Sequence, residues 1–132
     1  MIKVIKIYSS FSVPDLDKAK EFYGSILGLA VNQRPEGLDL KISNDNNVFI
    51  YYSPNNKPAD FTVLNLVVDD VELAVDELMD KGLMMEQYDM PGLKTDNKGL
   101  VRSEREGGMG PHVMAWFKDP AGNIIALSQK AK

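Results

Sequence analysis

The chain has 132 residues, of which 44% are hydrophobic and 26% are charged, and its formal net charge is -4. This size suits one globular core, and the negative charge argues against nucleic acid as a partner, because phosphate binding needs a basic face. The absence of cysteine excludes disulfides, thiolate metal sites and a cysteine nucleophile. Apolar runs are too short to span a bilayer and no signal-peptide core is visible, so we expect a cytoplasmic protein without membrane contact.

A strand followed by a helix is predicted at the start of the chain. Residues from about Val4 to Val13 include an alternating apolar and polar stretch, which is the period of a strand. Asp15 follows a proline and is suited to cap a helix, and Gly28 is suited to end it. Between them, apolar residues recur at three- and four-residue steps, namely Leu16, Ala19, Phe22, Tyr23, Ile26 and Leu27.

The same unit recurs later in the chain. A strand is predicted over 61–68 and a helix over 70–82, with Asp70 and Gly82 in the places of Asp15 and Gly28. Such an internal repeat predicts two copies of one supersecondary unit.

The remaining segments predict three further strands in the first half and four in the second. In the first half these are 29–33, 38–43 and 48–53, with turns at 34–37 and 44–47. In the second half strands are predicted at 83–88, 100–104, 113–118 and 124–128, with a tight turn at 119–123. The glycine-rich segment 90–111 is either a functional loop or a plain surface loop.

These elements predict an α+β protein made of two βαβββ modules, covering about residues 1–55 and 60–130. We expect one domain, 1–132, in which the modules form a concave mixed sheet with a helix backing each half.

Three motifs carry a family resemblance that covers nearly the whole chain. They are residues 13–23 (VPDLDKAKEFY) with 27–29 (LGL), residues 68–71 (VDDV) with 81–82 (KG), and residues 117–124 (FKDPAGNI). With these motifs the sequence resembles the vicinal oxygen chelate superfamily, which includes glyoxalase I, extradiol dioxygenases and bleomycin-resistance proteins. The resemblance implies paired modules forming a cup, often in a dimer, and in catalytic members a divalent metal held by His, Glu or Gln.

The metal-ligand positions implied by the resemblance hold no suitable donors here. The four positions are occupied by Tyr8, Ile50, Val63 and Ala126. A register slipped by one residue gives Ser9, Tyr51, Thr62 and Leu127 instead. Neither set suits zinc or a hard cation, so no metal site and no cofactor are predicted, while a divalent metal held through other residues stays open.

Strand alternation predicts which side chains line the cup. If Phe11, Val13, Leu64, Leu66 and Val68 face the helices, their neighbours face the cup. The expected cup residues are Tyr8, Ser10, Ser12, Val48, Ile50, Tyr52, Val63, Asn65, Val67, His112, Met114, Trp116, Ile124, Ala126 and Ser128. From these and the glycine-rich segment, the predicted ligand-binding residues are Tyr8, Ser10, Tyr52, Asn65, Arg102, His112, Met114 and Trp116.

Each of these residues also has a structural alternative. Trp116 could close one end of the core or lie in a dimer interface. His112, the only histidine, is most simply a polar residue at the pocket edge. Arg102 and Arg105 are most simply part of a solvated loop, and as a lid they could pair with a carboxylate or phosphate on a ligand.

The leading functional hypothesis is a metal-independent protein that binds a small molecule, such as an antibiotic or a hydrophobic metabolite, as a homodimer. No catalytic residue is assigned, because no nucleophile or acid-base pair is assembled by the sequence. One alternative is a metal-dependent lyase, isomerase or dioxygenase of the same superfamily. Another is a non-catalytic interaction protein whose cup is filled.

Overall fold

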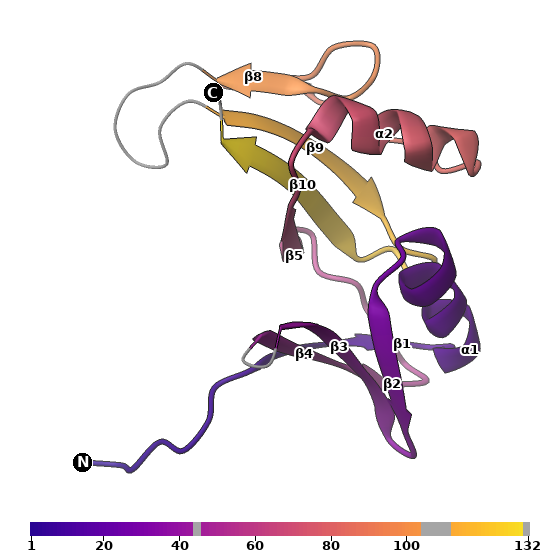
Figure 1. Cartoon of the computed structure of the whole chain (residues 1–132), viewed down its shortest axis with the longest axis vertical. Helices are drawn as coiled ribbons and strands as arrows, with labels where there is room; N and C mark the ends of the chain where they lie inside the picture. The colour runs from indigo at the N-terminus through magenta and orange to yellow at the C-terminus, as the bar shows by residue number, and fades with distance from the viewer. Residues whose placement is uncertain (44–45, 104–111, 131–132) are drawn as a thin grey trace. The chain divides into compact units, whose positions relative to one another are not determined.

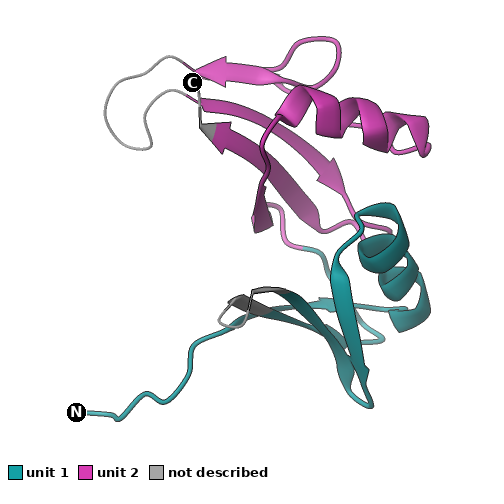
Figure 2. Cartoon of the chain, in the orientation of Figure 1, with its two compact units in different colours: residues 1–58 teal, residues 59–132 magenta. Residues whose placement is uncertain are grey.

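The computed structural model describes residues 1–43, 46–103 and 112–130. The chain divides into two compact units, residues 1–58 (unit 1) and residues 59–132 (unit 2) (Figure 2). Each unit contains a four-stranded sheet of mixed direction and one helical segment (Figure 1). The fold is therefore α+β and consists of βαβββ modules, as predicted. That the two units make one domain stays a prediction.

Unit 1 starts with β1 (Ser9–Val13), α1 (Leu16–Lys20) and η1 (Glu21–Ile26), and continues with β2 (Ala30–Arg34), β3 (Gly37–Ser43) and β4 (Asn46–Tyr52). The sheet order is β1-β4-β3-β2, with β1 parallel to β4 and the other pairs antiparallel. Its core is made of the buried side chains of Phe11, Val13, Ala19, Phe22, Tyr23, Leu38, Leu40 and Ile50.

Unit 2 repeats this order with β5 (Thr62–Val67), α2 (Val71–Asp80), β8 (Val101–Ser103), β9 (His112–Lys118) and β10 (Ile124–Lys130). The sheet order is β5-β10-β9-β8, and β5 runs parallel to β10. A small hairpin of β6 (Asp89–Met90) and β7 (Leu93–Lys94) lies outside this sheet. The helix α2 packs on β9 and β10 and buries Val71, Val75 and Leu78.

The helix caps confirm the internal repeat. Asp15 has φ -146° and ψ 103°, and Asp70 has φ -147° and ψ 107°. Each carboxylate accepts a bond from the main-chain N–H three residues later, at 3.1 Å in the first unit and 3.0 Å in the second. Gly28 and Gly82 then end the helices with φ values of 74° and 92°, which favour glycine.

The first helix differs from the regular helix that the sequence predicts. After five residues of α-helix it becomes the π-helix η1, in which the N–H of Leu27 donates to the carbonyl of Phe22, 2.9 Å away. Asp15 and Gly28 are thirteen residues apart, whereas Asp70 and Gly82 are twelve apart. A π-turn takes one residue more than an α-turn, so η1 accommodates the extra residue between otherwise equivalent caps.

One predicted strand is shorter than expected, and another is missing. The first strand begins at Ser9 rather than near Val4, because its ladder with β4 begins at the pair Ser9 and Val48, close to the start of β4. Residues 83–88 form no strand, and Met85 makes a single bridge to Phe117 of β9. The predicted turn at 44–47 falls partly on residues 44–45, which lie outside the described residues.

Candidate functional site

Each sheet has a helix on one face, and we call the opposite face the open face of that unit. In unit 2 the ladder aligns Asn65 with Ala126 and Trp116, so these side chains share one face. The next aligned row is Val67, Ser128 and Met114. The intervening residues of these strands face α2, where Leu64, Leu66, Ala115, Phe117, Ile125 and Leu127 are buried.

Four predicted site residues meet on the open face of unit 2. Trp116, Met114 and His112 alternate along β9 and are half-buried, and Asn65 is exposed on β5. Val67, 77% exposed, adds an apolar side chain to the same face. Ligand binding by these residues stays a prediction.

Tyr88 belongs to this group, although nothing in the sequence pointed to it beyond its place in the expected strand 83–88. Its ring meets Trp116 edge to face, with 5.6 Å between centroids. Its main-chain N–H donates to the Thr95 hydroxyl at 2.8 Å, which ties it to the end of the β6–β7 hairpin. Burial, with a smaller contribution from the charge of Glu86, raises the pKa of Tyr88 above 10.0, so the phenol stays neutral and can donate a hydrogen bond.

The open face of unit 1 holds two other predicted residues in different settings. Ser10 is exposed and pairs in the ladder with Phe49. Tyr8 lies just outside the sheet, 57% exposed, with the Lys6 ammonium 5.8 Å from its ring centroid. Among the described residues of unit 1, neither has a contact that defines a catalytic role.

The placement of Tyr52 on the cup side is wrong. The parallel ladder aligns Tyr52 with Val13 and Ile50 with Phe11, so Tyr52, Ile50 and Val48 lie on the helix side of the sheet. Ile50 is fully buried there. Alternation determines which residues of a strand share a face. A shift of one residue in the pairing of β4 with β1 exchanges the two faces, and the sequence alone does not establish that pairing.

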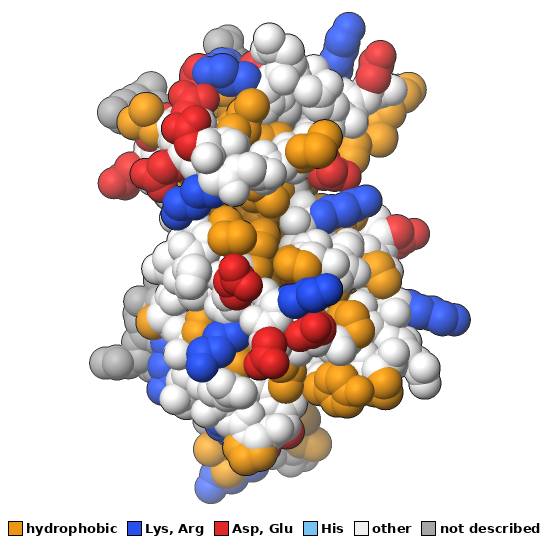
Figure 3. Space-filling view, turned by 90° about the vertical axis from the view of Figure 1, so that its right-hand side faces the viewer, with side chains coloured by type: hydrophobic (Ala, Val, Ile, Leu, Met, Phe, Trp, Pro, Cys, Tyr) orange, Lys and Arg blue, Asp and Glu red, His pale blue; other side chains and the backbone are white. Residues whose placement is uncertain are grey.

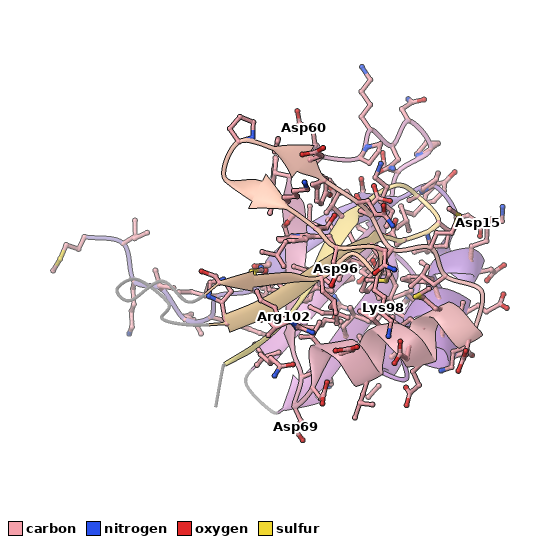
Figure 4. The ribbon with its side chains drawn as sticks, turned by 90° about the horizontal axis from the view of Figure 1, so that it is seen from above. Asp15, Asp60, Asp69, Asp96, Lys98 and Arg102 are labelled. Atoms are coloured by element: carbon pink, nitrogen blue, oxygen red, sulfur yellow. The ribbon has the colours of Figure 1, made fainter. Side chains whose placement is uncertain are left out.

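Arg102 faces α2 rather than the open face. It aligns with Val113 on the helix side of the sheet, and its Nη2 lies 2.9 Å from Glu72 Oε1. Lys98 joins the same cluster, 3.2 Å from Glu72 and 3.1 Å from Asp76 (Figure 4). Arg105, the other predicted lid residue, lies outside the described residues.

The residues at the implied metal-ligand positions do not fit a divalent metal. Val63 and Ala126 have no side-chain atom that could bind a metal. The counterpart of Ala126 in unit 1 is Phe49 rather than Ile50, because Ala126 pairs with Asn65 of β5 and Phe49 pairs with the equivalent Ser10 of β1. Within the described ranges, no three histidine, aspartate or glutamate side chains cluster in a way that could hold a metal ion.

The surface drawn in Figure 3 mixes acidic, basic and apolar side chains and shows no field of one sign. In the described part of the chain, no helix has the length and apolar character needed to cross a membrane.

Comparison with solved structures shows the fold. A virulence protein from Salmonella typhimurium is 18% identical, with a TM-score of 0.69 over 99% of both chains. A glyoxalase/bleomycin resistance protein/dioxygenase from Alicyclobacillus acidocaldarius is 16% identical, with a TM-score of 0.67 over 97% of this chain and 92% of the other. A fosfomycin resistance protein from Listeria monocytogenes is 14% identical, with a TM-score of 0.65 over 99% and 96%.

Comparison with curated proteins found no match. The model of one protein family, in contrast, matches residues 7–127, which is nearly the whole chain. The paired modules, their capping aspartates and this match lead to one conclusion: the chain belongs to the Glyoxalase/Bleomycin resistance protein/Dioxygenase superfamily.

Proposed function

We propose that the protein binds a small apolar or aromatic molecule on the open face of unit 2, without the help of a metal. The observation that carries this proposal is the Trp116 and Tyr88 pair, which stands on the same face as Met114 and the exposed amide of Asn65. Apolar and aromatic walls with a few polar groups are typical of small-molecule sites.

Main-chain hydrogen bonds hold the strand segment that carries Trp116. The Trp116 carbonyl accepts a bond from the Glu86 N–H at 2.8 Å, and Trp116 pairs across the ladder with the buried Ala126. These bonds hold the backbone, and the contact with Tyr88 restricts the Trp116 ring, so the ring loses less freedom when a ligand stacks on it, which favours binding. Met114 adds a flexible thioether that can adapt to the shape of a ligand.

No reaction is part of the proposal, because the described residues of this face include no assembled nucleophile or acid-base pair. As part of this proposal, the protein is a cytoplasmic homodimer that binds neither nucleic acid nor a membrane. The names of the family and of its Alicyclobacillus member make bleomycin a reasonable first compound.

The only tryptophan, Trp116, reports on this face by its fluorescence. After treatment with a chelator, the full chain is titrated with bleomycin and with 2-naphthol, and we expect a saturable change in emission for at least one of them. Met114→Ala should weaken that binding about three- to tenfold, because it removes apolar contact area. Met84→Ala is the matched control, since Met84 is 83% exposed and lies outside the sheet; it should bind like the wild type.

The same titration separates the alternatives. Emission changes that require added Zn²⁺ or Mn²⁺ would overturn metal independence and favour the lyase, isomerase or dioxygenase. An unchanged emission with both compounds, with and without metal, would favour an interaction protein whose face is already covered.

A further inference from the structure

The open face of unit 1 carries a concentration of positive charge in a protein whose net charge is -4. A pocket of about 240 Å³ is lined there by three cations, Lys6, Arg34 and Lys41, by the carboxylate of Asp39 and by the rings of Tyr8 and Phe49. Three of the strands of this sheet contribute, since Arg34 ends β2, Asp39 and Lys41 lie on β3, and Phe49 lies on β4.

Arg34 is the ordered centre of this pocket. Its guanidinium carbon lies 4.7 Å from the centroid of the Phe49 ring. Its Nε is 3.2 Å from Asp39 Oδ2 and 3.7 Å from Glu36 Oε1. The side chain is nevertheless 45% exposed, whereas that of Asp39 is only 16% exposed. The guanidinium is thus supported on an aromatic ring and oriented by a carboxylate, while nearly half of the Arg34 side chain remains accessible.

Gly37 is the residue that permits this arrangement. A Cβ atom at Gly37 would lie 2.9 Å from the Phe49 ring and 2.2 Å from the Ile50 carbonyl oxygen. Only a residue without a side chain lets the ring lie across β3, where it can support Arg34.

The chemistry of the pocket points to an anion. Arginine binds carboxylates and phosphonates through paired N–H donors, and the two lysines add charge that Asp39 alone does not balance. The rings of Tyr8 and Phe49 can contact an apolar body attached to the anionic group. A volume of about 240 Å³ lies below the usual range for whole drug-sized ligands, so it suits one end of a molecule.

We propose that Arg34, with Lys6 and Lys41, forms a recognition site for the carboxylate or phosphonate group of a small organic anion. This site lies in unit 1 and does not depend on ligand binding by the open face of unit 2. A purely structural cluster, in which Arg34 only packs on Phe49, is the opposing reading and is an outcome of the test.

The experiment is calorimetric titration of the full chain with benzoate, phenylphosphonate and the neutral isostere benzamide. We expect at least one anion to bind at least tenfold more tightly than benzamide, and its binding to weaken as salt rises. Arg34→Gln should lower the affinity for that anion about tenfold or more. Arg102→Gln is the matched control, an exposed arginine that also pairs with a carboxylate, and should leave the affinity unchanged.

A second variant tests the site even if Arg34→Gln has a folding defect. Lys41 is exposed and makes no ion pair with a described residue, so Lys41→Gln should keep the wild-type melting temperature and still bind the anion several-fold more weakly. Trp116→Phe should bind the same anion as tightly as the wild type does. Loss of anion binding in this variant would overturn the assignment of the site to unit 1. Equal binding of benzamide, no heat from either anion, or equal losses in Arg34→Gln and Arg102→Gln would each overturn the proposal.

Discussion

Replacing Asp119 by alanine should destabilise unit 2 more than any other loss of a single turn carboxylate in the described residues. Asp119 stands between β9 and β10 and is only 5% exposed. Its Oδ1 accepts the main-chain N–H groups of Ala121 at 2.9 Å and Asn123 at 2.8 Å, and its Oδ2 accepts the Asn123 side-chain amide at 3.0 Å.

The expected loss of unfolding free energy follows from how well each donor can replace the lost carboxylate. Ala121 is only half-buried, so water can replace the acceptor of its N–H and this loss costs little. Asn123 is only 2% exposed, and its main-chain and side-chain donors would be left buried without their acceptor. With about 1–3 kcal/mol for each buried group left unsatisfied, Asp119→Ala should cost about 3 kcal/mol. Asp119→Asn keeps one acceptor oxygen and should cost about half as much.

Urea unfolding followed by circular dichroism measures this difference. The matched control is Asp96→Ala, because Asp96 also accepts two main-chain N–H groups, from Lys98 and Leu100, both at 2.9 Å. Asp96 is exposed, and of its two donors only the N–H of Leu100 belongs to a buried residue, so the loss should be about 1 kcal/mol, clearly smaller than that of Asp119→Ala. Equal losses in the two alanine variants would refute the argument that burial sets the cost.

Three further predictions concern stability. Asp70→Ala removes the N-cap of α2 and should lower the free energy of unfolding by about 1 kcal/mol in urea. Gly37→Ala places a Cβ atom 2.2 Å from the Ile50 carbonyl oxygen and should cost about 1–3 kcal/mol, visible as a lower melting temperature. Because the pKa of Tyr88 is raised above 10.0, the folded state keeps a proton that the unfolded chain loses, so stability should fall as the pH rises above about 10. The urea midpoint of Tyr88→Phe should show a smaller fall over that range, and an identical fall would contradict this assignment.

Much of the fold could be predicted because it rests on local rules. The aspartate caps, the terminal glycines and the apolar stripes need only neighbours within a few residues, and the structure has them in both units. Alternation was also sufficient on β5 and β9, where Leu64 and Phe117 point to the core as expected.

The faces of β4 and β8 could not be predicted, because they depend on pairing between distant segments. Tyr52 shares a face with Val13 through a register that the sequence of β4 does not contain. Arg102 turns to α2 through its pairing with Val113, and then forms an ion pair with Glu72, thirty residues away. The charged pocket around Arg34 was missed for the same reason, since its residues come from separate strands.

The extra residue in η1 affects how the two halves of the chain should be compared. Asp70 follows Asp15 by 55 residues, whereas Gly82 follows Gly28 by 54, so an ungapped alignment of the halves fails inside the first helix. A mismatch of one residue matters in such a comparison, because strands alternate with a period of two and a shift of one residue exchanges the two faces of a sheet. A gap placed within η1 keeps the capping aspartates and the terminal glycines in correspondence. The later strands need a separate gap, because Phe49 on β4 corresponds to Ala126 on β10, 77 residues further along the chain.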